Sequence, residues 1–121
     1  MSKDKKWIFV AGIFGFSGVA LGAFGAHIIS DSLTENLYDT YKTGVLYHLI
    51  HSVVILAIGL SQIRNFNTCA LFFSIGIILF SFSLYLYAFT GNSVFAMITP
   101  IGGVSFLAGW TLLVWKALSK K

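Results

Sequence analysis

The residues of this sequence that could do chemistry are a few polar side chains set within long apolar stretches. They are His27, Tyr47, His51, Ser83, Tyr85 and Thr99. A polar group that is buried among apolar side chains costs free energy unless it finds a hydrogen-bonding partner. We therefore expect these six residues to gather in one polar pocket.

Histidines at helical spacing are the first indication of a metal site. His48 and His51 are three residues apart, so a helix would present both on one face, and His27 could be a third ligand. No carboxylate lies within the apolar stretches to complete or orient such a set. The signal is weak, and we expect neither a bound metal nor a cofactor.

Two other kinds of chemistry would use the same residues. Tyr47 and His51 are four residues apart and could form a proton relay on one helix face. A hydrolase needs a nucleophile, a base and an orienting group, and Ser83 with His51 lacks the third. We therefore predict no catalytic residue and no enzymatic activity. The sequence favours a structural role, in which each imidazole bonds to a neighbouring hydroxyl or carbonyl group.

The composition indicates which elements must hold these residues. Of the 121 residues, 57% are hydrophobic and 10% are charged, whereas soluble domains carry about 25% charged residues. A helical membrane span needs about 20 apolar residues, and the long uncharged run after Arg64 must hold two spans with a turn at Thr90–Ser93. The sequence thus predicts an all-α fold, a single four-helix transmembrane domain over residues 1–121. The spans are placed at 7–29, 43–62, 69–89 and 94–115.

Small residues indicate where the helices approach one another. Gly18, Gly22 and Ala26 recur every four residues and would form a smooth stripe on one face of the first span. In the fourth span, Gly102 and Gly103 follow Pro100, which removes a backbone donor and is expected to kink the helix or to delay its start to about Thr99. We expect these five small residues to serve helix packing.

A short amphipathic helix is predicted over residues 33–42, as a lead-in to the second span. Ser32 and Glu35 have the spacing of a capping box, with Ser32 as the N-cap. Apolar and aromatic residues share one face of this segment, and the charged residues lie on another. The lead-in would lie on the outer membrane interface or rise from it.

The placement of charge predicts the orientation. Seven of the eight Lys and Arg residues fall at the two termini and in the loop between the second and third spans, whereas acidic residues dominate the loop between the first and second. Under the positive-inside rule, both termini are cytoplasmic. The six candidate residues then fall in the outer half of the bilayer. The partner expected is the lipid bilayer; nucleic acid is not expected, and homo-oligomer formation stays open.

The order of motifs resembles one known family. The stretch Gly22-Ala-Phe-Gly-Ala-His27 is similar to a signature of the DUF423 family, small bacterial membrane proteins related to the eukaryotic transmembrane protein 256 group. Further matching stretches are Tyr47-xxx-His51, Leu84-Tyr85 before Thr90-Gly91, and Thr99-Pro100-Ile101-Gly102-Gly103 leading to Gly109-Trp110. The resemblance implies a polytopic protein of the cytoplasmic membrane with no established biochemical activity.

Two positions depart from the family pattern. His48 stands where an amide such as Gln is expected, which weakens any metal site that needs it. Phe82 stands where Gly is expected before Ser83, so the packing between the third and first spans should differ locally.

Two functions are compatible with these observations. The favoured one is a non-enzymatic integral membrane protein that affects membrane or envelope properties. The alternative is a small transporter or channel component that binds an ion, a proton or a small ligand in the polar pocket. Transport predicts a water-accessible cavity that reaches His27, His51 and Tyr85, whereas a dry cluster with every polar atom paired contradicts it.

Overall fold

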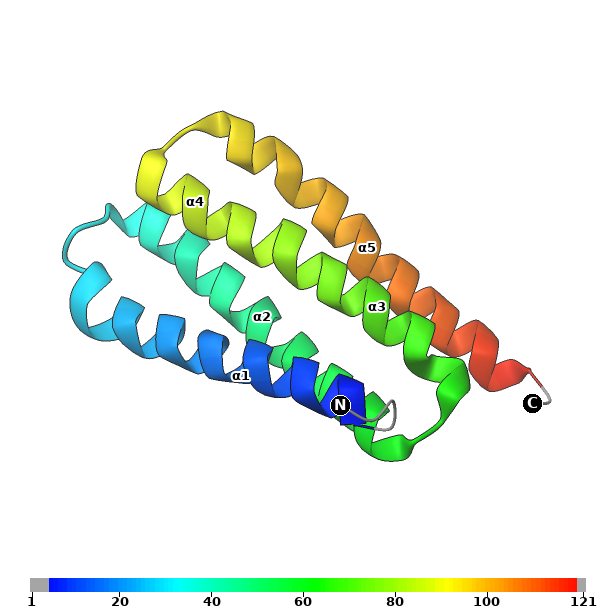
Figure 1. The fold of residues 1–121 in the computed structure, drawn as a ribbon. Helices are drawn as coiled ribbons and strands as arrows, with labels where there is room; N and C mark the ends of the chain where they lie inside the picture. Colours follow the sequence, from blue (N-terminus) through cyan, green and yellow to red (C-terminus); the bar gives the residue numbers. More distant parts are fainter. Residues whose placement is uncertain (1–4, 120–121) are drawn as a thin grey trace.

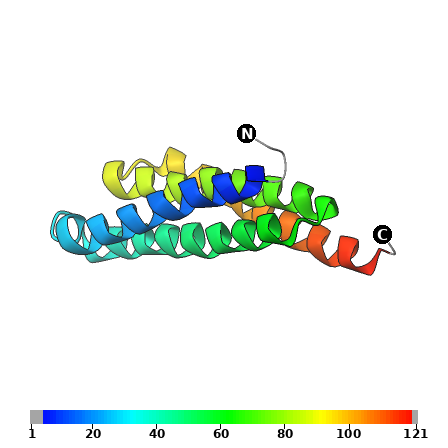
Figure 2. The ribbon, with the colours of Figure 1, turned by 60° about the horizontal axis from the view of Figure 1, so that its bottom comes forward.

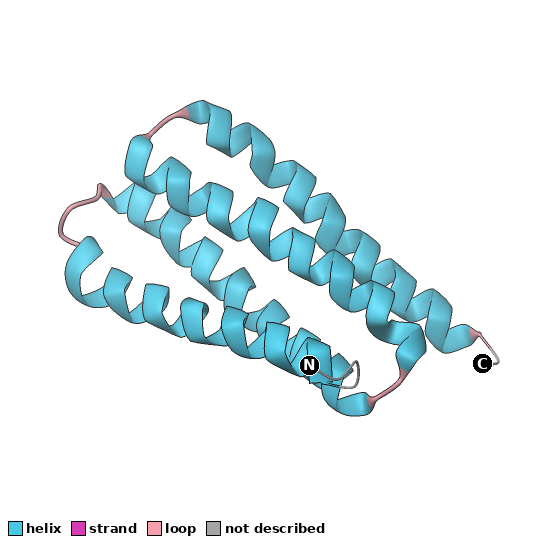
Figure 3. Cartoon of the chain, viewed as in Figure 1, coloured by secondary structure: helices cyan, strands magenta, loops and turns pink. Residues whose placement is uncertain are grey.

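The computed structural model describes residues 5–119, which form an antiparallel bundle of helices (Figures 1 and 3). Its helical elements are α1 (Lys6–Phe24), η2 (Gly25–Ile29), α2 (Glu35–Ser61), η3 (Arg64–Phe66), α3 (Asn67–Gly76), η4 (Ile77–Ser81), α4 (Phe82–Thr90) and α5 (Ser93–Leu118). Four continuous segments are long and apolar enough to cross a membrane: Lys6–Ile29, Glu35–Ser61, Arg64–Thr90 and Ser93–Leu118. The all-α, four-span fold class is therefore confirmed.

The spans pack largely in the order of the sequence. The first lies along α2, α2 packs on the third span, and α5 lies along the third span from α3 to α4 (Figures 1 and 2). The third span is the most enclosed, and the first is the least. α1 begins and α5 ends at the same end of the bundle, which we call the terminal end (Figure 1).

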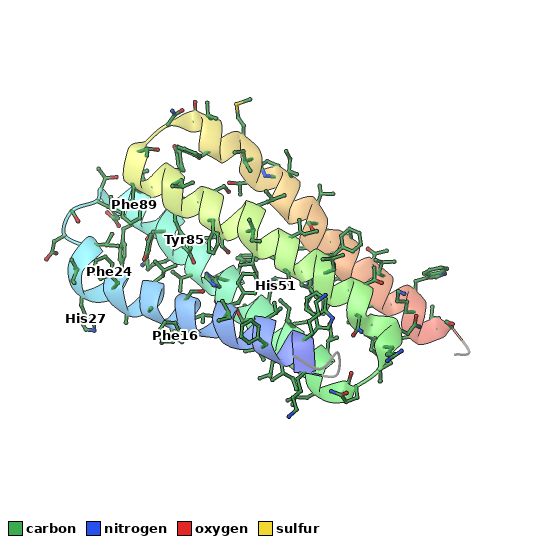
Figure 4. All side chains as sticks on the ribbon, viewed as in Figure 1. Phe16, Phe24, His27, His51, Tyr85 and Phe89 are labelled. Atoms are coloured by element: carbon green, nitrogen blue, oxygen red, sulfur yellow. The ribbon has the colours of Figure 1, made fainter. Side chains whose placement is uncertain are left out.

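The outer surface of the bundle is apolar along its length. Phe16 is 79% exposed and Met97 is 72% exposed, and the Phe16 side chain points away from the other helices (Figure 4). Large apolar side chains exposed on this scale are unfavourable in water but suit contact with lipid. The exposed surface agrees with a chain that lies in the bilayer.

The helix α2 includes both the lead-in and the second span without a break. It begins at Glu35, and the hydroxyl of its N-cap residue Thr34 accepts from the Leu37 N–H at 3.3 Å. The expected Ser32 cap is wrong, because the Ser32 N–H and hydroxyl both bond back to the carbonyl of Ile29, at 2.9 and 3.0 Å. Ser32 thus belongs to the end of the preceding turn.

Glycines allow α1 and α2 to approach closely. A methyl group on Gly18 would lie 2.7 Å from the Leu49 side chain, and one on Gly22 would lie 3.1 Å from Val45. Ala26 is exposed, and Gly25 lies against the Tyr41 ring instead. Two turns of a helix with 3.6 residues per turn lead from Gly18 to residue 25, so Gly25 rather than Ala26 returns to the face that meets α2.

The helix α5 runs through Pro100 without interruption, so its start is not delayed to Thr99. It begins after Asn92, whose side chain caps it by accepting from the Val94 N–H at 3.0 Å. The preceding turn at Gly91 has a φ of 67°, a left-handed conformation that glycine adopts without strain. Gly102 packs directly on the backbone of Leu79 and Phe80 in η4.

The adjacent glycines of α5 provide a matched test of this contact. A Cβ at residue 102 would lie 2.7 Å from the Phe80 Cα, whereas one at 103 meets only the Phe80 ring, at 3.8 Å. We expect Gly102→Ala to lower the free energy of unfolding by about 1–3 kcal/mol, because backbone cannot move aside. Gly103→Ala should change it by less than about 1 kcal/mol.

The measurement is the loss of helical circular dichroism during unfolding of the purified protein in detergent micelles. Equal destabilisation by the two variants would contradict the close contact at Gly102.

Candidate functional site

The six candidate residues do not converge on one pocket. The structure distributes them over separate helix interfaces, where most of them join one span to the next. His27 lies at the end of the first span, exposed and pointing away from the bundle, with no side-chain partner within residues 5–119 (Figure 4). His51 and Tyr85 lie in the interior, on α2 and α4 (Figure 4).

One of the most enclosed polar groups is His48, which was not among the six. It is fully buried, and its two ring nitrogens bond to two different spans. The Nδ1 atom lies 2.8 Å from the Tyr85 hydroxyl on α4, and Nε2 lies 3.1 Å from the Ser17 hydroxyl on α1. In the sequence, His48 attracts attention through its spacing of three residues from His51. That spacing does not show which helices the two side chains bond to.

The bonding partners assign a tautomer to His48. The Ser17 hydroxyl lies 3.1 Å from both the Phe14 carbonyl and His48 Nε2, and both contacts are hydrogen bonds only when it donates its one proton to the carbonyl and accepts from the histidine. Nε2 therefore carries the proton, and the bare Nδ1 accepts from the Tyr85 O–H. The result is a chain of directed hydrogen bonds from Tyr85 through His48 to the α1 backbone.

His51 is held in the opposite tautomer. Its Nδ1 lies 2.9 Å from the Tyr47 carbonyl, which can only accept, so Nδ1 carries the proton. The indole N–H of Trp110 donates to the bare Nε2 at 3.1 Å, which joins α5 to α2. The ring also stacks on Phe106, with centroids 3.8 Å apart and an interplanar angle of 13°.

Ser83 and Thr99 form a direct contact between α4 and α5. Their hydroxyl oxygens are 2.6 Å apart, so one hydroxyl donates to the other, and the hydroxyl that accepts can donate to the carbonyl one turn earlier, which is Phe80 for Ser83 (2.8 Å) and Phe95 for Thr99 (3.3 Å). Three further hydroxyls donate to the backbone of a neighbouring span. These are Tyr41 to Leu21 at 2.6 Å, Ser81 to Gly44 at 2.7 Å and Ser105 to Phe72 at 2.7 Å. Such bonds hold helices together where lipid removes the usual hydrophobic drive.

Tyr47 is 38% exposed, and its hydroxyl has no hydrogen-bond partner within residues 5–119. It lies at the edge of an apolar groove between α2 and α5, with a volume of about 430 Å³. The groove is lined by Tyr47, His51, Phe80, Pro100, Gly103, Val104, Phe106, Leu107 and Trp110. It is open on the lipid-facing side, where Val104 and Leu107 are exposed.

The buried polar groups are paired with one another or with the backbone. Across the described residues, every buried side-chain nitrogen and oxygen has a hydrogen-bond partner. The same residues contain no group of three His, Cys, Asp or Glu side chains placed to hold a metal ion. The arrangement can therefore align helices, but it offers no free base beside a free nucleophile.

Opposite tautomers of the two neighbouring histidines are a direct consequence of these bonds. We expect Nε2–H for His48 and Nδ1–H for His51. Nitrogen-15 NMR of histidine-labelled protein in micelles or bilayers distinguishes the two forms, with Tyr85→Phe and Trp110→Phe variants to assign the signals. The same tautomer at both positions would contradict the assigned direction of one of these bonds.

Two tyrosines provide a matched comparison, because the Tyr85 hydroxyl bonds to His48 whereas the Tyr47 hydroxyl has no hydrogen-bond partner within residues 5–119. Tyr85→Phe removes the proton that His48 accepts and should lower the free energy of unfolding by about 1–2 kcal/mol. Tyr47→Phe removes a hydroxyl with no partner and should change it by less than about 0.5 kcal/mol. Unfolding in micelles, followed by circular dichroism, measures both. If Tyr47→Phe costs as much as Tyr85→Phe, the bond to His48 is not a source of stability.

Comparisons with known proteins agree on one family. The profile of the family described as "Protein of unknown function (DUF423)" matches residues 21–103. A UPF0382 membrane protein of Haemophilus influenzae is 40% identical over 97% of both chains, and the UPF0382 inner membrane protein YgdD of Escherichia coli is 39% identical over 98% of this chain and 93% of its own. The UPF0382 membrane protein YwdK of Bacillus subtilis is 37% identical over 94% of this chain and 97% of its own. No solved structure gives a significant match. With its four apolar spans and these relatives, the chain belongs to the DUF423 family of small bacterial membrane proteins, whose activity is not established.

Proposed function

We propose that this chain is a non-enzymatic protein of the cytoplasmic membrane that acts in the plane of the bilayer and affects membrane or envelope properties. The observation that supports this most is the pairing of the buried polar atoms within residues 5–119. A transport pathway or a catalytic centre needs polar groups that can exchange partners. Here the polar groups of the interior bond to one another and to the backbone.

The shape of the chain also favours action within the membrane. Only short segments connect the spans, at 30–34, 62–63 and 91–92. The described residues form no domain outside the helices that could hold a soluble substrate or partner. The surfaces available for recognition thus include the apolar faces of α1 and α5, which can contact lipid or another copy of the chain.

A hydrolytic centre finds no support in the contacts of Ser83 and His51. The Ser83 hydroxyl bonds to Thr99 and to the Phe80 carbonyl, and both nitrogens of His51 are occupied, by Tyr47 and Trp110. Neither residue has a bond to the other. The pair therefore lacks the nucleophile–base contact that such chemistry requires.

The orientation with both termini in the cytoplasm belongs to the same proposal. The terminal end carries Lys5, Lys6, Arg64 and Lys116, whereas Asp31, Glu35 and Asp39 lie at the opposite end. The excess of basic residues at one end supports a cytoplasmic location for that end.

Ion flux distinguishes the proposed function from a transporter. The purified protein is reconstituted into vesicles loaded with a pH-sensitive dye, and a potassium diffusion potential is applied. We expect proton and cation flux equal to that of protein-free vesicles, because no exchangeable polar pathway supports conduction. Vesicles containing the Tyr85→Phe variant serve as a matched control.

Flux that depends on the protein and falls in the Tyr85→Phe variant would overturn the proposal. It would make the Tyr85–His48–Ser17 chain of hydrogen bonds a conducting element.

A further inference from the structure

A pocket at the terminal end of the bundle has features that the helix packing does not explain. It lies between η3 and the last turn of α5 and has a volume of about 380 Å³. Its lining residues are Asn65, Trp115, Lys116, Leu118 and Ser119. A cationic side chain, an indole and a primary amide are thus placed around one hollow at a membrane boundary.

The charge of Lys116 has no carboxylate to balance it within residues 5–119. The side chain is half-buried, and its Nζ donates to the Asn65 amide oxygen at 3.1 Å. The amide is neutral, so this bond does not neutralise the positive charge of the lysine. The one ion pair of the described residues joins Lys42 to Asp39 at the opposite end. Except for Asp4, which lies outside the described residues, all acidic residues of the chain fall between 31 and 39.

The surroundings of Lys116 fit a molecule that is part anion and part hydrocarbon. Trp115 is 68% exposed, and its indole N–H has no bonding partner within residues 5–119. Tryptophan favours the membrane boundary, where its ring contacts acyl chains and its N–H reaches polar headgroups. Leu118 adds an apolar surface that is 78% exposed. A free phosphate ion would use the lysine but would leave both apolar side chains uncovered.

We propose that this pocket binds the phosphate headgroup of an anionic phospholipid, with Lys116 as the charged contact and Trp115 beside the ester and upper acyl region. Of the three Nζ donors of Lys116, one is used by Asn65, so others are free to bond phosphate oxygens. A second copy of the chain in the same orientation would bring its acidic segment to the other side of the membrane. Charge complementarity therefore favours lipid over a copy of the chain.

The test measures binding of lipid to the purified full chain in neutral detergent. Thermal unfolding is followed with added dioleoylphosphatidylglycerol, with the same amount of dioleoylphosphatidylcholine, or with inorganic phosphate. We expect a rise in Tm with the anionic lipid alone, because a ligand that binds only the folded state stabilises it. Lys116→Gln should weaken the apparent affinity by about fivefold, as expected for one lysine near an anionic surface.

Lys5→Gln is the matched control, because Lys5 is an exposed cation at the same end and does not line the pocket. It should retain the affinity of the parent protein, and so should Lys116→Arg, which keeps the charge. An equal effect of both lipids, a full effect of inorganic phosphate, or an equal loss in Lys5→Gln would overturn the proposal.

A second measurement does not require the lysine variants to fold. Phosphatidylglycerol with brominated acyl chains quenches the fluorescence of a nearby tryptophan, and the comparison is with the same brominated phosphatidylcholine. We expect stronger quenching by the anionic lipid in the parent protein, with the difference lost in Trp115→Phe. Equal quenching by both lipids would contradict a headgroup site beside Trp115.

Discussion

The bundle depends on the hydrogen bonds of two histidines in α2, because their side chains link that helix to each of the other three spans. His48 bonds to Ser17 in α1 and to Tyr85 in α4, and His51 accepts from Trp110 in α5. In lipid, apolar side chains gain little by leaving one oily surface for another, so directed bonds and close packing determine which helices pair. A neutral imidazole suits this role, because its rigid ring offers one donor and one acceptor.

Close packing by glycine makes these bonds geometrically feasible. Gly18 in α1 lies against the His48 ring, where a Cβ would come within 3.1 Å of the ring carbon Cδ2. Gly44 in α2 lies against the Tyr85 ring, where a Cβ would come within 2.8 Å. The two glycines thus make room for both members of the His48–Tyr85 pair. Larger residues there would move the helices apart and lengthen the bonds, so the small-residue contacts and the polar contacts are one structural feature.

The sequence predicted the features that follow from long-range averages of hydropathy and charge. Apolar runs gave the all-α, four-span fold, and Thr90–Ser93 gave the last turn. Two local features were not predicted: the helical repeat of 3.6 residues per turn places Gly25, in place of Ala26, on the face that meets α2, and Thr34 replaces Ser32 as the cap. The dispersal of the polar residues could not be predicted either. Which helix a side chain such as His48 faces depends on how the spans rotate about their axes, and hydropathy does not specify that rotation.

The saturation of the interior limits where this chain can recognise anything. Polar groups that bond to one another and to the backbone stabilise the bundle, and within residues 5–119 no buried side-chain nitrogen or oxygen is left without a partner. Recognition must then use groups that remain unpaired at the surface, and the charged ones among them are unevenly distributed. Lys42 forms an ion pair with Asp39, whereas the hydrogen-bond partner of Lys116 within residues 5–119 is the neutral amide of Asn65. The charge asymmetry that favours a cytoplasmic terminal end also leaves Lys116 without a carboxylate partner within residues 5–119, which is why an anionic headgroup is the ligand proposed for that end.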